Sequence, residues 1–364
     1  MSDTIHILGI ETSCDETSAS IVTGEGKILS NLVLSQLEEH RAFGGVVPEI
    51  AARAHLDHLD TLIKGALSDS GLSFNDLTAV AATSGPGLIG GVMVGMVAGK
   101  AIAAAQDIPF LGINHLEGHA LTPRLTDPDI QFPYLLLLIS GGHTQILLVE
   151  GAGKYQRWGT TLDDAAGECF DKSAKIMGLP YPGGPQVQKI AAECLDPKTA
   201  KKRFPLPKPL KGRDGCDFSF SGLKTAVRNH AEKLPAGDFK REDIADLACT
   251  FQSTMADVLK DRCQNAITRF KDTYGEATDC TLVVSGGVAA NTAIRAALHE
   301  LCDKQHIRFY APPLDLCQDN AAMIAWTGVE RFRLGLVDSL DFKAKPRWPL
   351  DPDAPPRHGA GVKA

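Results

Sequence analysis

Two histidines separated by one turn of a predicted helix could bind a metal ion. His115 and His119 stand at i and i+4 in the run HLEGH, a spacing that turns both side chains to one face of an α-helix. The run departs from the H-E-x-x-H pattern of zinc proteases, because Glu117 lies two residues after His115, about 200° around the helix. From there it cannot easily activate a metal-bound water. The histidines therefore fit a metal site but not a protease, although two such histidines can equally be ordinary polar residues.

A metal held by two histidines needs a third ligand from elsewhere in the chain. Asp319, in the run CQDNAAMIAW, is the best candidate, although an acid just before an apolar helix ordinarily caps that helix. His55 and His58 form another pair at i and i+3, but the neighbouring acids Asp57 and Asp60 favour a solvated helix face. We therefore expect the aspartate, and not the second histidine pair, to complete the site.

Two glycine-rich segments look like nucleotide-binding loops but lack parts of the required patterns. GPGLIG at 85–90 matches G-x-G-x-x-G after a strand-like run, yet Pro86 stiffens the turn and the segment lies far from the first strand, so a tight strand-to-helix turn is favoured. Gly95 and Gly99 enclose three residues where a P-loop needs four, and Ala101 stands where a magnesium-binding hydroxyl is required. The sequence thus excludes a P-loop.

The composition indicates one large domain or two, with no general affinity for nucleic acid. The chain has 364 residues, with 37 Lys and Arg against 44 Asp and Glu, a net charge of −7. Its nine cysteines include no C-x-x-C pair, which favours reduced thiols in the cytoplasm. We expect no signal peptide, because acids occur early. We expect no membrane span either, because the longest uncharged stretch, 77–99, contains the helix-breaking run SGPGLIGG.

Strand-like apolar runs alternate with helix-like segments, which is typical of an α/β protein. The expected strands are 5–10, 18–23, 77–83, 135–139, 145–149 and 281–284. The expected helices are 48–67, 90–105, 115–123, 163–177, 241–270, 288–302 and 319–334. Residues 196–215 are rich in Pro, Lys and Gly and are expected to form an insertion or long loop. Residues 346–364 carry five prolines and little apolar content, so we expect a disordered tail.

The chain also shows a weak internal repeat. Residues 7–22 form an apolar run, a polar turn and a second apolar run, and residues 135–149 repeat this shape with SGGHT as the turn. A third strand at 281–284 leads into SGGVAAN. Glycine turns of this kind can cradle phosphate with their N–H groups. The repeat fits a duplicated nucleotide-binding fold, and by shape alone it fits two ordinary hairpins even better.

Ordered motifs along nearly the whole chain resemble the TsaD family of tRNA N6-adenosine threonylcarbamoyltransferases, of the bacterial type. They are GIETSCDETS at 9–18, SGPGL at 84–88, NHLEGH at 114–119, SGGHTQ at 140–145, DKSAKIMGLPYPGGP at 171–185, FSFSGLKTA at 218–226, SGGVAAN at 285–291 and QDNAAMIA at 318–325. The resemblance implies an actin-like, Hsp70-like ATPase fold with two RNase H-like domains flanking a cleft. The expected domains are 1–130 with about 322–345, and 131–321 with the loop 196–215.

The resemblance also implies a reaction. The threonylcarbamoyl group of threonylcarbamoyl-AMP is transferred to the N6 amine of the adenosine 3′ of the anticodon, in tRNAs that read codons beginning with adenine. Bacterial members of the family work with TsaB-like and TsaE-like subunits. A metalloprotease, and a kinase or regulatory ATPase of the same fold, remain as alternative functions at this point.

Site residues follow from the same resemblance. His115, His119 and Asp319 are the expected ligands of one divalent metal per subunit, with iron favoured and zinc possible. Asp15 and Glu16 are the candidate catalytic residues, as a proton acceptor or as groups that position the substrate. The expected substrate-binding residues are Leu138, Ile139, Ser140, Gly141, Gly142, Asp171, Gly184 and Asn291. Archaeal relatives have a tyrosine ligand where this chain has Leu138, so substrate oxygen or water must complete the metal sphere here. Each of these residues could instead have an ordinary structural role. Asp15 could belong to a polar turn, Asp171 could be a solvated acid paired with Lys175, and Asn291 could cap a helix.

A local basic segment could contact tRNA despite the negative net charge. Residues 198–213 contain no acid and seven positive side chains: Lys198, Lys201, Lys202, Arg203, Lys208, Lys211 and Arg213. Such a segment can meet tRNA phosphates, and it can equally be an ordinary solvated loop. No aromatic residues are interleaved in a way that suggests base stacking.

Overall fold

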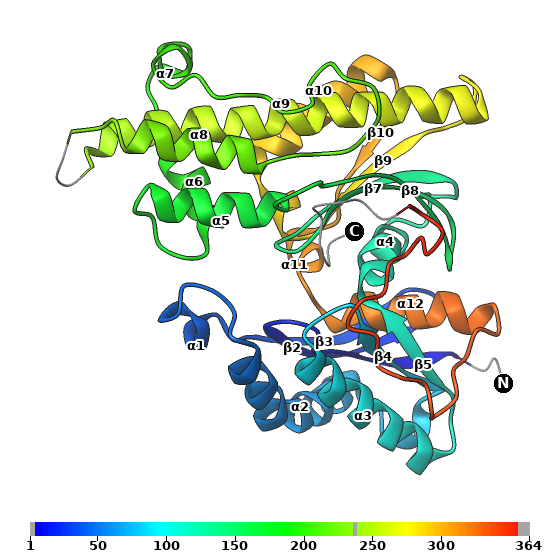
Figure 1. Ribbon diagram of the computed structural model, residues 1–364. Coiled ribbons are helices and arrows are strands. Elements are labelled where there is room, and N and C mark those ends of the chain that lie inside the picture. Colours follow the sequence, from blue (N-terminus) through cyan, green and yellow to red (C-terminus); the bar gives the residue numbers. More distant parts are fainter. Residues whose placement is uncertain (1–3, 236–238, 356–364) are drawn as a thin grey trace. The chain divides into compact units, whose positions relative to one another are not determined.

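The computed structural model describes residues 4–235 and 239–355, and its chain divides into two compact units. Unit 1 comprises Met1–Phe132, Glu150–Tyr155 and Pro312–Pro352. Unit 2 comprises Pro133–Val149, Gln156–Ala311 and Asp353–Ala364. The chain thus leaves unit 1 after Phe132 and returns to it at Pro312, apart from the short stretch Glu150–Tyr155. Figure 1 shows the elements of both units.

Unit 1 is built on a five-stranded mixed sheet in the order β3-β2-β1-β4-β5. Its strands are β1 (His6–Glu11), β2 (Glu16–Thr23), β3 (Ile28–Ser35), β4 (Ala79–Gly85) and β5 (Phe110–Asn114). β2 runs antiparallel to its neighbours β1 and β3, whereas β1, β4 and β5 are parallel. β4 and β5 are buried along their whole length, as expected for parallel strands covered on both faces.

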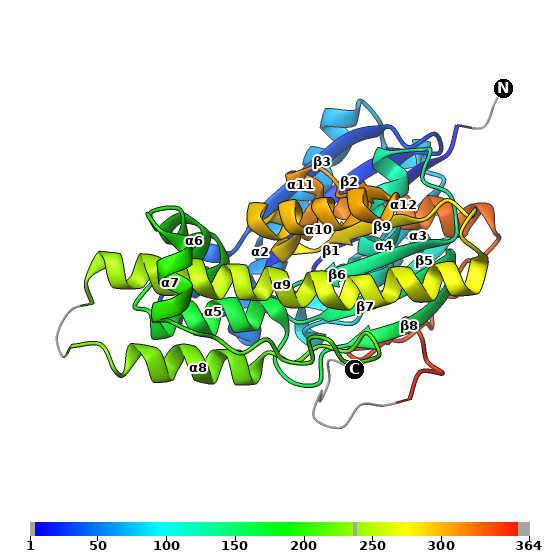
Figure 2. The same ribbon diagram turned by 90° about the horizontal axis from the view of Figure 1, so that it is seen from above.

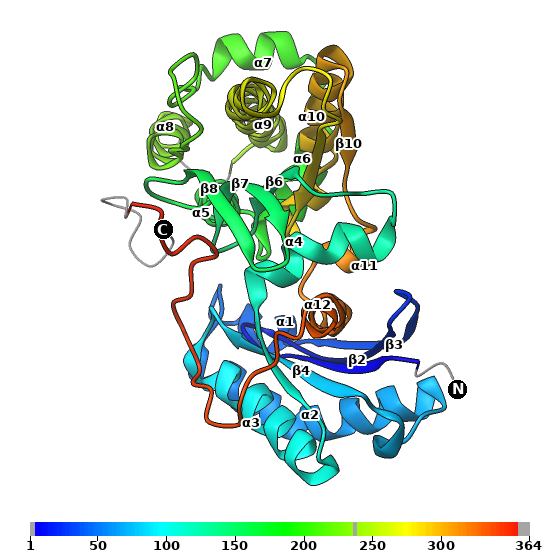
Figure 3. The same cartoon turned by 90° about the vertical axis from the view of Figure 1, so that its right-hand side faces the viewer.

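Helices cover both faces of this sheet. α2 (Pro48–Ser70) and α3 (Ile89–Gln106) lie on one face, and α12 (Ala321–Arg333) lies on the other beside α4 (His115–Thr126) (Figure 3). Alternate residues of β1 serve the two faces, with Leu8 and Ile10 buried under α2 and α3 and Ile7 buried under α12. The shorter helices of the unit are α1 (Leu37–Arg41), η1 (Phe74–Asp76) and α11 (Leu314–Cys317).

α3 is the one helix in the described part of the chain that is long and apolar enough to cross a membrane. It instead packs on the sheet: Val92 and Met96 are buried, and a Cβ at Gly99 would lie 3.1 Å from the Cβ of Ala82. This agrees with the predicted buried strand followed by a helix.

Unit 2 repeats the sheet of unit 1. Its strands are β6 (Tyr134–Ile139), β7 (Thr144–Gly151), β8 (Lys154–Thr160), β9 (Thr281–Ser285) and β10 (Arg308–Tyr310). Their order is β10-β9-β6-β7-β8, so the first strand of each unit is flanked by its second and fourth. β6 is antiparallel to β7 and parallel to β9, as β1 is to β2 and β4. The duplicated fold, which the two hairpins allowed and the family resemblance implied, is therefore confirmed.

Helices complete unit 2 (Figure 2). They are α5 (Ala166–Ile176), α6 (Gly183–Ala191), α7 (Pro197–Arg203), α8 (Ser221–Ala231), α9 (Arg241–Tyr274), η2 (Gly287–Ala290) and α10 (Thr292–Gln305). The long helix α9 packs against α6, α7 and α10. Its inward face is apolar, with Phe251, Leu259 and Phe270 fully buried.

The segment 196–215 is more ordered than a long loop. It contains α7, and Asp196 caps that helix by accepting hydrogen bonds from the N–H groups of Lys198 and Thr199. Acids on α9 then hold the rest of the segment: Arg203 pairs with Asp243, and Lys208 with Asp257. Acids distant in the sequence thus neutralise two of the seven positive charges.

The prediction of a disordered tail over residues 346–364 is wrong for its first residues, which are held by hydrogen bonds. Gly87 N–H donates to the carbonyl of Pro346 (3.3 Å), and the Asn114 side-chain amide donates to the carbonyl of Trp348 (2.9 Å). Proline lacks an N–H but keeps its carbonyl, so a proline-rich segment can still be held through its oxygens. Residues 356–364, the remainder of that prediction, lie outside the described residues.

We predict that Gly9→Ala destabilises unit 1, because α12 lies directly on β1 at this glycine. A Cβ at Gly9 would lie 2.3 Å from the Ala321 carbonyl oxygen and 2.7 Å from the Ala325 nitrogen. Both atoms are backbone, so the helix must move, at a cost of about 1–3 kcal/mol. Urea unfolding measures this cost. The control is Gly45→Ala, which has open space around the new methyl group; equal unfolding midpoints for the two variants would contradict the packing argument.

Candidate active site

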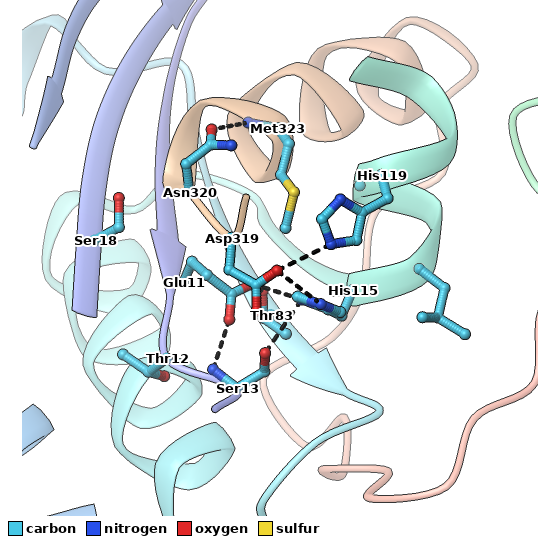
Figure 4. A network of polar contacts seen from close by, with 12 residues as sticks. Glu11, Thr12, Ser13, Ser18, Thr83, His115, His119, Asp319, Asn320 and Met323 are labelled. Atoms are coloured by element: carbon cyan, nitrogen blue, oxygen red, sulfur yellow. Dashed lines mark hydrogen bonds and ion pairs between the residues drawn. The ribbon is translucent and has the colours of Figure 1, made fainter. Parts of the chain in front are cut away.

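The two histidines of HLEGH and Asp319 meet in unit 1. The ligand atoms of His115, His119 and Asp319 all lie within 4.8 Å of one another. Nε2 of His119 lies 3.0 Å from Oδ1 of Asp319, and Nε2 of His115 lies 3.5 Å from the same oxygen (Figure 4). Two imidazole nitrogens and one carboxylate form a donor set suited to a single divalent transition metal.

Helix caps place these side chains. α4 begins directly after β5, and the side chain of Asn114 caps it by accepting from Leu116 N–H (2.9 Å). α12 is capped by Asn320, whose side chain accepts from Met323 N–H (3.0 Å; Figure 4). Asn320, and not Asp319, is therefore the residue that caps α12. The Asp319 carboxylate faces the two histidines instead.

Glu117 lies in the core and not at the metal centre. It is 2% exposed and accepts hydrogen bonds from Gly153 N–H (2.8 Å) and the Tyr155 hydroxyl (3.0 Å). Arg331 forms an ion pair with its second oxygen (3.2 Å). Engaged by three partners, Glu117 cannot act as the general base of a zinc protease, in agreement with its position two residues after His115.

The second histidine pair differs from its prediction. His55 is fully buried, with Nδ1 2.8 Å from the Thr17 hydroxyl and Nε2 3.2 Å from the Cys14 carbonyl oxygen. A solvated helix face is therefore wrong for His55, although Asp57 beside it is exposed. Burial lowers the pKa of His55, which favours a neutral imidazole held by hydrogen bonds.

A buried carboxylate that the sequence analysis missed lies behind the metal ligands. Glu11, the last residue of β1, is fully buried, and Oε2 lies 3.0 Å from Nδ1 of His115. Ser13 N–H donates to its other oxygen (2.5 Å), and the Thr83 hydroxyl donates to Oε2 (2.5 Å). An acid at the end of an apolar strand was the available signal, because such an acid must find partners when buried.

The carboxylates around His115 favour a positive charge at this site. Burial by itself would lower the pKa of His115, but the charges of Asp319 and Glu11 outweigh it and raise that pKa from 6.5 to about 9. Burial in turn would raise the pKa of Glu11, but His115 holds it below its usual value. The charges of Asp319 and Glu11 therefore favour a cation at the position of His115.

Asp15 and Glu16 lie in the turn from β1 to β2 and at the start of β2. The Asp15 carbonyl accepts from Gln36 N–H (2.9 Å), which fixes the turn. Burial, together with the charges of Asp319 and Asp15, raises the pKa of Glu16 well above its usual value. A carboxyl group with a raised pKa binds a proton more readily than an ordinary carboxylate, so Glu16 is suited to proton transfer.

The predicted substrate-binding residues of unit 2 fall into two groups. Leu138 and Ile139 are fully buried in β6, so only their backbone can contact a substrate. Ser140 N–H donates to the His143 carbonyl (2.8 Å) and closes the turn, while positions 141 and 142 have open space where a Cβ would be. The turn therefore leaves room for a ligand to approach its backbone.

Of the other three predicted residues, Gly184 and Asn291 lie at helix starts in unit 2, and Asp171 lies within α5. Asp171 accepts from Gly183 N–H (2.7 Å) at the start of α6, where Gly184 has open space around it. Asn291 caps α10 by accepting from the N–H groups of Ala293 and Ile294 (both 3.1 Å). Its amide also donates to Gln252 (2.8 Å). The helix cap considered for Asn291 is therefore present.

Comparisons with known proteins agree with this architecture. Residues 27–326 match the family model described as TsaD: tRNA N6-adenosine threonylcarbamoyltransferase. The chain is 60% identical over 370 residues to a tRNA N6-adenosine threonylcarbamoyltransferase of Rhodospirillum rubrum, with both chains fully covered. It is 56% identical over 362 residues to one of Brucella canis, covering 98% of each chain. The crystal structure of full-length HypF in the phosphate- and nucleotide-bound form matches with a TM-score of 0.57 and 11% identity, over 91% of this chain and 46% of that one. This last likeness shows the fold alone, the actin-like, Hsp70-like ATPase fold.

Proposed function

Because the chain belongs to the TsaD family of tRNA N6-adenosine threonylcarbamoyltransferases, we propose that it transfers the threonylcarbamoyl group of threonylcarbamoyl-AMP to tRNA. The acceptor is the N6 amine of the adenosine 3′ of the anticodon, in tRNAs that read codons beginning with adenine. Full-length identity of 60% to a transferase of that name carries this proposal. The engaged position of Glu117 argues against the metalloprotease alternative.

The metal centre supports the same chemistry. His115, His119 and Asp319 would hold one divalent ion, for which we propose iron before zinc, because two histidines and one carboxylate form the facial triad of non-haem iron sites. When bound, the metal would supply Lewis-acid stabilisation of charge that develops on the phosphate or carbonyl oxygen.

The transfer forms a C–N bond between the carbamoyl carbon and N6 and breaks the C–O bond to AMP, and N6 loses a proton. Asp15 and Glu16 are our candidates to accept that proton or to position the substrate. Asp15 precedes β2, Glu16 begins it, and the charge of the metal ligand Asp319 acts on Glu16. The open turn Ser140–Gly142, with Leu138 and Ile139 leading into it, would bind the substrate through backbone groups. Asp171, Gly184 and Asn291 would shape the site for its nucleotide.

We predict that the purified protein, with its partner subunits, converts tRNA adenosine to the threonylcarbamoyl form when given threonylcarbamoyl-AMP. His115→Ala should abolish this, because it removes a metal ligand. Asp15→Asn should slow single-turnover transfer by about 10²–10⁴-fold if Asp15 accepts the proton. Mass spectrometry of digested tRNA measures the product.

His299→Ala, on the exposed face of α10, serves as the control in this assay. Normal single-turnover transfer by Asp15→Asn would remove Asp15 from the chemistry. ATP turnover that needs neither tRNA nor threonylcarbamoyl-AMP, without modified adenosine, would instead favour the kinase or regulatory ATPase of the same fold.

We propose that the segment 196–215 contacts tRNA phosphates. All seven of its positive side chains are exposed, and Arg203 and Lys208 are also paired with acids of α9. The other five are Lys198, Lys201, Lys202, Lys211 and Arg213. The segment is held on α9, where the buried Arg262 donates to the Gly215 carbonyl (3.2 Å) and Gly212 N–H donates to Asp261 (3.2 Å). A fixed backbone lowers the entropy lost when such side chains bind phosphate.

Charge reversal at Lys201 and Lys202 should weaken tRNA binding and lower its salt dependence. Removing two phosphate contacts reduces the slope of log K against log salt concentration by about two. Filter binding at several salt concentrations measures this slope. The control is Lys304→Glu on α10, a lysine paired with Glu300. An unchanged slope in the double variant would exclude this segment from the tRNA contact.

We propose the cytoplasm as the compartment, and TsaB-like and TsaE-like subunits as protein partners. An apolar groove of about 630 Å³ between α2 and α3 supports a protein contact in unit 1. Large side chains at its edge are exposed: Leu56 (66%), Met93 (41%) and Val97 (52%). Exposed apolar side chains gathered on one helix pair are typical of a protein interface, and we assign this one to the TsaB-like subunit.

Val97→Asp should weaken binding of the TsaB-like subunit by more than about tenfold, because a charge would be buried in an apolar contact. Titration calorimetry measures the affinity. Leu195→Asp provides a matched control, since Leu195 is a 98% exposed apolar residue of unit 2. Equal affinity of both variants would place the subunit elsewhere on the protein.

A further inference from the structure

The metal ligand His115 is held by a hydrogen-bond network on its side away from Asp319. Nδ1 of His115 lies 3.0 Å from Oε2 of Glu11 and 3.1 Å from the Ser13 hydroxyl (Figure 4). Nε2 of the same ring faces Asp319 at 3.5 Å. One nitrogen therefore belongs to the metal centre and the other to the network behind it.

The chemistry of the partners decides which nitrogen of His115 carries a proton. An ionised carboxylate only accepts hydrogen bonds, so Nδ1 must donate to Glu11. A neutral imidazole has one N–H, and with that proton on Nδ1 the lone pair lies on Nε2, which faces Asp319. The contact with Glu11 thus selects the form of His115 that can bind a metal.

Glu11 cannot easily turn away from this role. Its Oε1 accepts from Ser13 N–H and its Oε2 from the Thr83 hydroxyl, both at 2.5 Å. Ser13 lies two residues after the end of β1, and Thr83 belongs to the neighbouring strand β4. Two adjacent strands of a buried sheet therefore fix both oxygens of the carboxylate.

His119 lacks this support. Its Nδ1 is buried and has no hydrogen-bond partner in the described part of the chain. Nothing but Asp319, at 3.0 Å from Nε2, orients this ring by a hydrogen bond among the described residues. The orientation of the pair therefore depends mainly on His115.

We propose that Glu11 is a positioning residue, which holds His115 in the Nδ1–H form and so prepares Nε2 as a metal ligand. This inference rests on the metal centre of the proposed function. Partners of this kind behind a metal ligand typically contribute about 10–100-fold in metal affinity.

Glu11→Gln tests the role with little change in shape. The glutamine oxygen must accept from Ser13 N–H, so its NH₂ group turns to Nδ1 of His115. Nδ1 must then accept, and the ring proton moves to Nε2, where it blocks the metal. We expect zinc, used as the probe in competition with a chelating dye, to bind this variant about 10–100-fold more weakly than the wild type.

Nitrogen-15 NMR of labelled histidine provides a readout that a merely structural role would not change. In the zinc-bound wild type we expect the proton of His115 on Nδ1, and in metal-free Glu11→Gln at pH 10 we expect it on Nε2. The matched control is Glu117→Gln, which alters another buried carboxylate, on α4. Its partners are Gly153, Tyr155 and Arg331, and none of them is a metal ligand. It should keep zinc affinity within about threefold of wild type.

Three outcomes separate the possibilities. Weak zinc binding by Glu11→Gln, with normal binding by Glu117→Gln and the proton on Nε2, supports the proposal. Wild-type affinity in Glu11→Gln, or a proton that stays on Nδ1, overturns it. Zinc binding that is absent in the wild type, or unaffected by His115→Ala, instead overturns the metal centre itself.

Discussion

The close approach of α12 to the sheet of unit 1 is the constraint on which the metal centre depends. Gly9 of β1 has no side chain where the Ala321 carbonyl passes, and Gly328 of α12 has none where Ala81 of β4 lies. Ser18 of β2 accepts a hydrogen bond from Ala321 N–H, across 303 residues of sequence. Because α12 is seated in this way, the residue just before it, Asp319, reaches the two histidines of α4.

Much of this arrangement could be predicted from the sequence. The helical spacing of His115 and His119 placed both on one face, and the duplicated hairpins indicated the repeated sheet, because side-chain periodicity is a local property. The four edge strands β3, β5, β8 and β10 were missed. β3 mixes polar and apolar residues, and β10 has three residues. Short edge strands carry little of the apolar signal that identifies buried ones.

Contacts between distant residues were beyond local reasoning. The positive charges of residues 198–213 have no acid among them in the sequence, but Asp243 and Asp257 on α9 neutralise two of them. The role of Glu11 could not be predicted from its own segment. It depends on contacts with Thr83 of β4 and His115 of α4, which only the fold brings close. In both cases the chemistry is in the sequence, and only the fold brings the partners together.

The hydrogen bonds that hold residues 345–348 in the segment after α12 come from their backbone. Ser84 accepts from Lys345 N–H, Gly87 N–H donates to the Pro346 carbonyl, and Asn114 donates to the Trp348 carbonyl. Every amino acid has a carbonyl, so these contacts do not depend on which side chains the segment carries. The attachment constrains the path of the backbone and leaves the side chains of these residues free to vary. The amino-acid composition can therefore resemble that of a disordered tail although the backbone is held in place.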